Sequence, residues 1–159
     1  MANRMYTVSF ENVSISAAQD LFEITPADDK PVAIAGLFLS NVGGTADAGD
    51  AQEELLRLAI IRGFTTSGSG GSAPTPAPCA PADSAAGFTA EVNNTTLANT
   101  GTTATLHADG WNVRVPYGNW WIPEAWIWAS QANTTIVVRL VGAPADAVSC
   151  SGTLYVIEA

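Results

Sequence analysis

The feature that most constrains the fold of this chain is a run of sixteen residues, Ser67 to Ala82, that reads SGSGGSAPTPAPCAPA. Its first half is a flexible Gly/Ser coil, and its prolines stiffen the second half toward polyproline II. Long segments without secondary structure are uncommon inside compact domains and mark function or disorder. Because such a segment buries little of its own surface, we expect an extended arm at about 67–82 that stands in solvent or lies on another protein.

The rest of the chain has the pattern of a β protein. Tyr6 to Phe10 and Asp20 to Thr25 alternate between apolar and polar residues, and Val32 to Val42 is apolar on both faces. Further strands are predicted at Phe88–Val92, Thr102–Leu106, Trp111–Val115, Trp126–Ala129, Thr134–Val141 and Val148–Ile157. Short strands separated by Gly, Pro and Asn turns indicate an antiparallel sandwich or barrel. We therefore expect residues 1–159 to form one all-β domain, an antiparallel β-sandwich with a jelly-roll-like strand order.

Two segments fit a helix as well as they fit other structures. Asp50 and Glu53 resemble a capping box at the start of Glu53 to Phe64, and Leu55, Leu56, Ala59 and Ile60 fit a helical stripe. Leu56, Leu58 and Ile60 also alternate, and the neighbouring segments are strands, which favours a strand. Asp83 to Ala86 is expected to form one helical turn.

The charge of the chain limits its partners. Only 13% of the residues are charged, about half the usual share, and the net charge is −9. Nucleic-acid binding needs positive charge to neutralise phosphates, and the six basic residues are scattered, so nucleic acid and anionic membranes are excluded as partners. A surface with few charges must be covered by small polar residues or by neighbouring chains, which favours an oligomer.

The opening residues MANRMYTVSF contain no apolar signal region, and the apolar stretch near Val32 to Leu39 is too short to span a bilayer. The expected compartment is therefore the cytosol of the cell that makes the protein. Disulfides rarely persist there, so Cys79 and Cys150 are expected to be free thiols.

Residues for chemistry are scarce. His107 is the only histidine, and neither a nucleophile elbow nor a phosphate-binding loop is present. Asp47, Asp50 and Glu53 could offer oxygen atoms to calcium, but their spacing matches no EF-hand loop. We expect no catalytic residues, no metal and no cofactor, and conclude that the protein is not an enzyme.

The second informative feature is a cluster of tryptophans. Four of the five fall within nine residues, at Trp120, Trp121, Trp126 and Trp128. In strands, Trp126 and Trp128 would share one face, whereas Trp120 and Trp121 would point to opposite faces. Three interpretations remain open: the rings belong to the core and loops, they form a protein interface, or they form a platform for sugars, as in carbohydrate-binding modules.

Four phrases carry a family resemblance: SAAQDLFEITPADDKP, EELLRLAIIRGFTTSGSGGSAPTP, GFTAEVNNTT and SGTLYVIEA. They resemble a group of small acidic virion proteins of tailed bacteriophages and prophages. The resemblance implies a structural part of the particle, with capsid decoration (cement) the favoured role. It also implies a compact β domain with an extended arm, a homotrimer, the major capsid protein as partner, and a place on the capsid surface after synthesis in the host cytoplasm.

The expected function is therefore a decoration protein that binds the outer surface of a phage head and stabilises contacts between capsomers. The alternative is a carbohydrate-binding module of a head or tail fibre. The residues expected at the protein interface come from the tryptophan cluster and from the arm: Trp120, Trp121, Trp126, Trp128, Pro74, Pro76 and Pro78.

Overall fold

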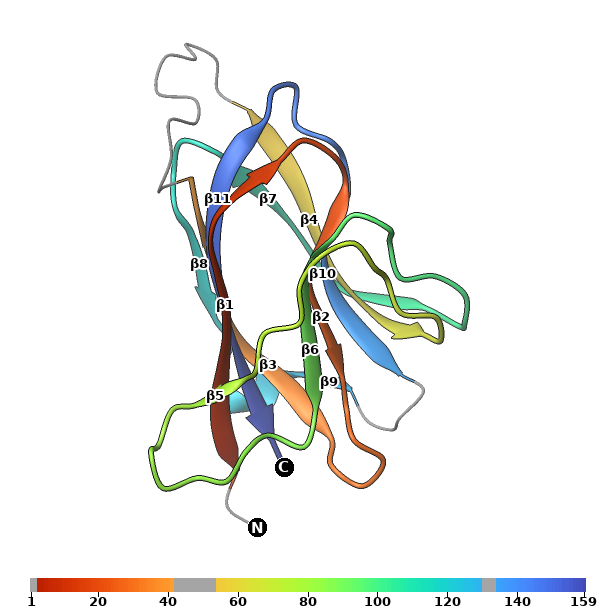
Figure 1. Ribbon diagram of the computed structural model, residues 1–159, viewed down its shortest axis with the longest axis vertical. Coiled ribbons are helices and arrows are strands. Elements are labelled where there is room, and N and C mark those ends of the chain that lie inside the picture. The colour runs from red at the N-terminus through yellow and green to blue at the C-terminus, as the bar shows by residue number, and fades with distance from the viewer. Residues whose placement is uncertain (1–2, 42–53, 130–133) are drawn as a thin grey trace.

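The computed structural model describes residues 3–41, 54–129 and 134–159, which form two antiparallel sheets packed face to face (Figure 1). Sheet A has the order β5-β1-β11-β3-β8, and β9 also pairs with β3. Its strands are β5 (Ala77–Pro78), β1 (Arg4–Ile15), β11 (Val148–Glu158), β3 (Val32–Ser40), β8 (Tyr117–Trp120) and β9 (Ile127–Ala129). Sheet B has the order β6-β2-β10-β4-β7. Its strands are β6 (Thr89–Asn94), β2 (Gln19–Thr25), β10 (Thr135–Leu140), β4 (Leu55–Phe64) and β7 (Ala104–Asn112).

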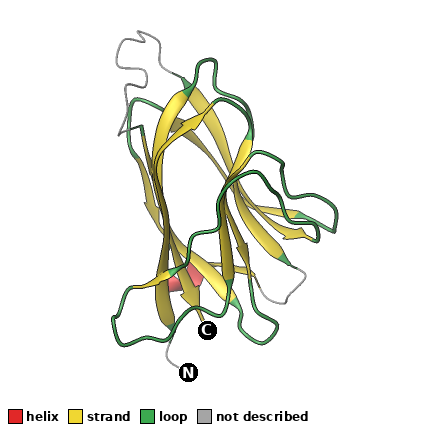
Figure 2. Cartoon of the chain, in the orientation of Figure 1, coloured by secondary structure: helices red, strands yellow, loops and turns green. Residues whose placement is uncertain are grey.

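The strand order is that of a jelly roll. β1, β11, β3 and β8 lie side by side in one sheet, and β2, β10, β4 and β7 lie in the other in the matching order. This is the double-sheet arrangement that covers eight strands with two interlocked Greek keys. The predicted fold class is thereby confirmed. β5 and β6 lie in a long insertion between β4 and β7, and among the described residues the single helical element is the short 3₁₀ turn Pro123–Ala125 (Figure 2).

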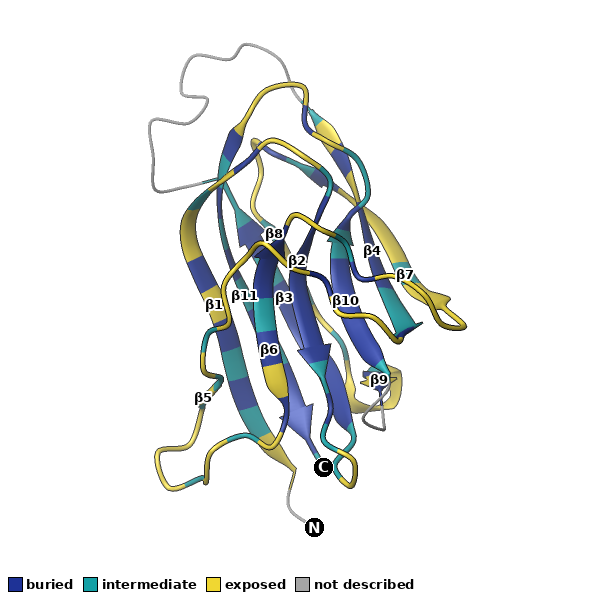
Figure 3. Cartoon of the chain, turned by 45° about the vertical axis from the view of Figure 1, so that its right-hand side comes forward, coloured by how far each residue is buried: buried dark blue, intermediate teal, exposed yellow. Residues whose placement is uncertain are grey.

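Period-2 alternation places the core between the sheets. Along β11, buried residues alternate with half-buried ones from Val148 to Val156, and β1 shows the same pattern from Tyr6 to Phe10. The largest fully buried side chains are Trp111, Tyr6 and Phe22, and the indole nitrogen of Trp111 donates to the carbonyl oxygen of Val115 at 3.0 Å. Figure 3 shows these buried positions as dark bands along the strands.

The ambiguous segment ending at Phe64 is a strand, as favoured, since β4 covers Leu55–Phe64. Its proposed cap lies outside the described residues, as do the calcium candidates Asp47, Asp50 and Glu53.

Two other local predictions are wrong. Thr102–Leu106 and Trp111–Val115 were expected to be separate strands, but β7 runs through both, and the chain turns only after Asn112, whose carbonyl accepts from the Val115 amide at 2.9 Å. Asp83–Ala86 is not a helical turn. The chain turns there through a bond from the Asp83 amide to the Ala80 carbonyl at 3.0 Å, and it passes on in irregular backbone to β6.

Candidate interaction surface

Three aromatic rings pack together on the outer face of sheet A, on the side turned away from the core. The ring centroid of Trp120 lies 4.5 Å from that of Tyr155 and 5.3 Å from that of Phe38, and the Phe38 and Tyr155 rings are 5.9 Å apart. The rings come from three neighbouring strands, β8, β11 and β3. We call Phe38, Trp120 and Tyr155 the aromatic cluster. Tilted and edge-on pairs at these separations add to the stability given by burial alone.

Two glycines allow the rings of the aromatic cluster to lie against the sheet. A Cβ atom at Gly36 would come within 2.6 Å of the Trp120 ring, and one at Gly118 would come within 2.7 Å of the Phe38 ring. Gly36 and Trp120 are direct partners across β3 and β8, and so are Phe38 and Gly118. Each ring therefore covers the place of a missing side chain on the neighbouring strand, which fixes the cluster at this point of the sheet.

A second aromatic pair extends this surface along β3. The rings of Trp126 and Trp128 are 6.1 Å apart, and Trp126 packs against a small cluster formed by Ala33, Ala35 and Ile157. The Trp126 indole donates to the carbonyl of Trp121 at 3.1 Å, and Arg62 donates to the carbonyl of Trp128 at 2.6 Å. Trp126 and Trp128 share a face, as the sequence predicted. Together with the aromatic cluster they form what we call the aromatic face.

Much of the aromatic face is open. Trp120 is 54% exposed and Trp128 is 36% exposed, which is unusual for the largest side chain in proteins. Trp121 does not belong to this surface: it packs against the core from the inner side, with its ring 5.2 Å from that of His107. The sequence predicts the opposite directions of Trp120 and Trp121, and the structure gives Trp121 a packing contact with the core, while its interface role stays a prediction.

His107 belongs to a polar cluster between β7 and β8, where the two sheets meet at their edges. The hydroxyl of Tyr117 donates to Asp109 Oδ2 at 3.0 Å, and His107 Nε2 lies 3.4 Å from both of these oxygen atoms. The Gly110 amide, the Tyr117 hydroxyl and His107 lower the pKa of Asp109. Burial and the neighbouring carboxylate raise the pKa of Tyr117, so its phenol stays protonated. These bonds explain His107 as a structural residue that joins the two sheets.

The arm lies along its own domain, contrary to the expectation that it stands in solvent or on another protein. Ser69 exchanges two backbone hydrogen bonds with Thr96, at 3.0 and 2.9 Å, and Ser72 exchanges two with Val92, at 3.1 and 2.8 Å. Farther along, β5 pairs with β1 of the other sheet. In Figure 1 the arm passes from the edge of sheet B to the edge of sheet A. Both edge strands, β6 and β1, thus gain partners that an open edge lacks.

Three prolines of the arm, Pro74, Pro76 and Pro78, are half-buried, whereas the residues at 73, 75, 77 and 79 are exposed. The role of these prolines at a protein interface stays a prediction. Cys79 is exposed and Cys150 is buried, and both are free thiols; burial raises the pKa of Cys150 to about 12.

Buried charged groups hold the loops that cover the outer face of sheet B. Asp20 is fully buried and pairs with Arg139, with Nε 2.6 Å from Oδ1. Asp20 also accepts from the Ala98 amide at 2.8 Å, and Arg139 donates to the Ala98 carbonyl at 2.8 Å. This ion pair therefore fixes both polar groups of one loop residue. Below the loop, Phe64, Ala98 and Val137 form a satellite core, and the Arg139 guanidinium lies 4.7 Å from the centre of the Phe64 ring.

A second buried carboxylate holds the start of the arm. Glu23 is 2% exposed and accepts from the Gly68 amide at 3.0 Å, the Ser67 hydroxyl at 2.5 Å and the Asn94 side-chain amide at 3.0 Å. Two donors from the arm and one from the end of β6 therefore replace the water that this carboxylate would bind in the unfolded chain. Sequence reasoning missed both carboxylates. Glu23 alternates with the core residues Phe22 and Ile24, so a period-2 pattern places it on the solvent side. Asp20 reaches the same outer face through a register shift between β2 and β10, which the local pattern does not show.

Some signals for the aromatic face are visible in the sequence. Gly36 interrupts an otherwise apolar strand, and a glycine inside a strand marks a close approach of another group. Nothing in the sequence marks Phe38 or Tyr155 as partners of Trp120, since all three come from distant parts of the chain.

In the part of the chain that the structure describes, no three His, Cys, Asp or Glu side chains are grouped so as to hold a metal ion. Within the same residues, no helix has the length and apolar character needed to cross a membrane.

No protein-family model and no curated protein matches this chain. Some solved chains match it weakly. One is from particles with T=1 symmetry derived from infectious bursal virus: the identity is 14%, the match covers 98% of this chain and 40% of that chain, and the TM-score is 0.16. Another is from the T13 particle of the same virus: the identity is 14%, the match covers 98% of this chain and 39% of that chain, and the TM-score is 0.15. This chain thus spans about two fifths of the length of these solved chains, and TM-scores this low carry no inference about it.

Proposed function

We propose that the protein is a structural component of a tailed-phage virion, a decoration protein that binds the outer surface of the head through its aromatic face. The observation that carries the proposal is the exposure of Trp120 and Trp128 on an ordered surface of sheet A. Large rigid aromatic side chains contribute most of the binding energy in protein interfaces. The family resemblance of the sequence supplies the identity of the partner, the major capsid protein.

The chemical character of the aromatic face supports a protein partner. The rings rest on Gly36 and on a cluster of Ala33, Ala35 and Ile157, so they are held in place before any partner arrives. Side chains that are already ordered lose little conformational entropy when they bind. The residues that form the aromatic face carry no charge, so a partner surface can be apolar without leaving a charge unpaired.

In this function the protein performs no reaction. Each copy contributes a modest contact, and a homotrimer that engages several capsid subunits at once raises the effective concentration of every contact after the first. Because the protein binds the assembled shell and not its free subunits, it stabilises the shell by mass action. A jelly roll suits this role but does not prove it, since the same fold serves lectins and enzymes.

The test is binding of Trp120→Ala to shells built from the major capsid protein of the same virus. We expect a loss of about 2 kcal/mol or more, roughly a thirtyfold higher Kd. Leu106→Ala is the matched control, because Leu106 is an exposed apolar residue on β7 of the other sheet. Trp128→Ala serves as a second variant if thermal unfolding shows that Trp120→Ala is misfolded. The proposal would be refuted if Trp120→Ala and Trp128→Ala both fold and both bind shells as tightly as Leu106→Ala does.

A further inference from the structure

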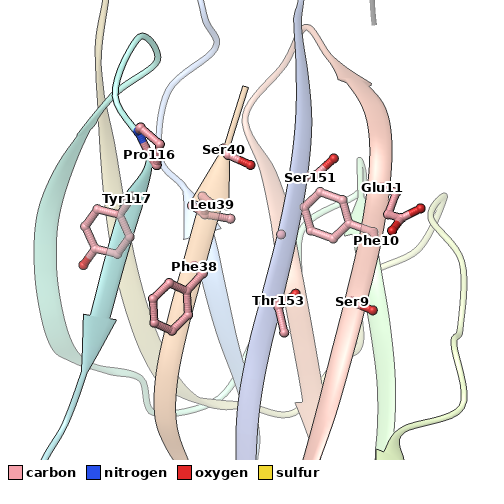
Figure 4. Close-up of a pocket in the computed structure, with 11 residues that line it drawn as sticks. Ser9, Phe10, Glu11, Phe38, Leu39, Ser40, Pro116, Tyr117, Ser151 and Thr153 are labelled. Carbon is pink, nitrogen blue, oxygen red and sulfur yellow. The ribbon is translucent and has the colours of Figure 1, made fainter. Parts of the chain in front are cut away.

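A shallow hollow of about 300 Å³ lies on the outer face of sheet A, beside the aromatic cluster (Figure 4). It spans β1, β11 and β3, and its side chains include Ser9, Glu11, Phe38, Ser40, Ser151 and Thr153. Its volume falls at the lower end of the range for small-molecule sites, about 300–1,000 Å³. The hollow lies beside Phe38–Ser40, near the end of β3, whereas Trp128 pairs with Ala33 near the beginning of that strand.

We infer that this hollow binds a neutral saccharide. Its walls combine two kinds of group that a sugar ring needs. Phe38 offers aromatic surface, which suits the apolar C–H face of a sugar. Hydroxyl groups and one carboxylate line the rest, and each hydroxyl can both donate and accept a hydrogen bond, as each sugar hydroxyl can.

The register of the strands brings these hydroxyl groups together. Ser9 is the direct partner of Thr153 across β1 and β11, and Ser40 is the direct partner of Ser151 across β3 and β11. Figure 4 shows Phe38, Thr153 and Ser9 in a row across the three strands. Residues directly opposite one another have Cβ atoms only about 4.5–5.5 Å apart. Adjacent hydroxyls of one sugar can therefore meet groups from two strands at once.

The backbone at the end of the hollow is shaped by an irregularity in β1. The register between β1 and β11 shifts between Phe10 and Val13, and Asn12 has a φ of 52°, in the left-handed region that asparagine tolerates. The Asn12 amide donates to Ser151 Oγ at 2.9 Å, which fixes the position of that hydroxyl at the edge of the hollow. Bulges of this kind are common next to binding sites, because they redirect side chains.

Charge determines which saccharides fit. The residues that line the hollow include Glu11 but neither lysine nor arginine. An anionic sugar would meet a carboxylate without a compensating cation, on a chain whose net charge is −9. A neutral sugar can instead donate two hydroxyl protons to the Glu11 carboxylate, and hydrogen bonds to a charged group are stronger than neutral ones.

The experiment is saturation-transfer difference NMR on the whole chain. The probes are neutral oligosaccharides of glucose, galactose, mannose and N-acetylglucosamine, with sialyllactose as the anionic comparator. We expect at least one neutral series to bind and sialyllactose to bind much more weakly. Glu11→Gln should raise the Kd by about tenfold or more, the size of a hydrogen bond to a charged group.

Ser9→Val and Thr7→Val form a matched pair, because both residues lie on the outer side of β1 but only Ser9 lines the hollow. Ser9→Val should weaken binding and Thr7→Val should leave it unchanged. Absence of binding by every neutral sugar, equal binding of sialyllactose, or full binding by both Glu11→Gln and Ser9→Val would each overturn the inference. Phe38 belongs to both the hollow and the aromatic cluster, but the two proposals are tested separately. Trp120→Ala tests shell binding without any sugar, and Glu11→Gln and Ser9→Val test the hollow without any shell.

Discussion

The two sheets of this jelly roll have outer faces of different kinds. On sheet B, loops from the β4–β7 insertion cover the strands, and two buried carboxylates, Asp20 and Glu23, hold those loops by hydrogen bonds. On sheet A, the outer face carries ordered aromatic rings that no described segment of the chain covers fully, and Trp120 remains 54% exposed. The same chain has thus covered one face with its own backbone and left the other open.

The difference indicates where a partner binds. A chain with a sixteen-residue arm could have laid it over its exposed tryptophans, which would have removed an aggregation hazard. Instead, Ser72 and Ser69 of the arm form backbone hydrogen bonds with Val92 and Thr96, and β5, also in the arm, pairs with β1. The arm therefore protects sheet edges and leaves the aromatic face available. If this comparison is right, substitutions on the covered face should change stability, and substitutions on the open face should change binding.

The largest stability effect is expected for Arg139→Met. This change leaves the fully buried Asp20 carboxylate without its cation, and removal of one partner of a buried pair costs about 3–5 kcal/mol. Arg57→Met is the control, because Arg57 is exposed on β4 of the same sheet and its change should cost at most about 0.5 kcal/mol. Urea unfolding at neutral pH measures both. Similar midpoints for the two variants would mean that the ion pair does not hold the covered face.

Glu23→Gln is expected to have the next largest effect. The glutamine amide nitrogen cannot accept, so one of the donors Gly68, Ser67 and Asn94 would face another donor in a buried place. Loss of a buried hydrogen bond to a charged group costs about 1.5–3 kcal/mol. Hydrogen exchange at the Gly68 amide should speed up accordingly. Glu124→Gln, at an exposed position of the 3₁₀ turn, should change neither stability nor exchange.

A matched pair of glycine substitutions compares the faces directly. A Cβ at Gly71, in the arm, would overlap the backbone of Val92 and Asn93, which cannot move away without undocking the arm, so Gly71→Ala should cost about 1–3 kcal/mol. The atoms nearest to a Cβ at Gly36 belong to the ring of Trp120, which would be displaced from its packed position. Because a half-exposed side chain moves more readily than backbone, Gly36→Ala should cost less, about 1 kcal/mol, and the displaced ring should weaken shell binding.

Gly142→Ala is the control for both glycine variants, because nothing lies within 4 Å of its added Cβ. Thermal unfolding and limited proteolysis within the arm read out the result. Equal destabilisation by Gly36→Ala and Gly71→Ala would show that the aromatic face is as firmly built into the fold as the arm, and would break the comparison.

The sequence predicts the parts of this molecule that depend on local pattern. Alternation along β1 and the apolar run in β3 identify those strands, and the all-β class follows from them. Local pattern also separates Trp120 from Trp121 by strand alternation. It fails where a distant segment changes the environment of a residue. Glu23 alternates as a solvent-facing residue should, and it is buried only because Ser67 and Gly68 fold over it.

The arm shows the same limit. Its composition indicates an extended segment, but composition cannot say what the segment lies on. The structure supplies the reason: β6 and β1 both have an open edge, and an extended backbone satisfies those edges with hydrogen bonds whatever its side chains are. The single strand β7 was divided in two by the expectation of a turn before Trp111, but the chain stays extended there, and Asp109 bonds across to Tyr117 of the other sheet.

The smallest effect is expected at the junction of the two sheets, where Asp109 on β7 accepts from Tyr117 on β8. The Gly110 amide, Tyr117 and His107 hold the pKa of Asp109 below its usual value of about 3.9, so ionised Asp109 stabilises the folded state. A lowered pKa gives stability that is present in full above the unfolded value and is lost as the pH falls through the folded one.

Wild type should therefore have a higher Tm than Asp109→Asn at pH 6, and this difference in Tm, the gap, should close as the pH falls below about 4. Because Asp109 is 46% exposed, solvent screens these interactions and the gap should be small. Asp28→Asn, at an exposed turn, should show no gap at either pH. A difference in Tm that persists unchanged into acid would mean that the Asp109 contacts act through packing rather than charge. The charge of Asp109 would then contribute nothing to joining the two sheets.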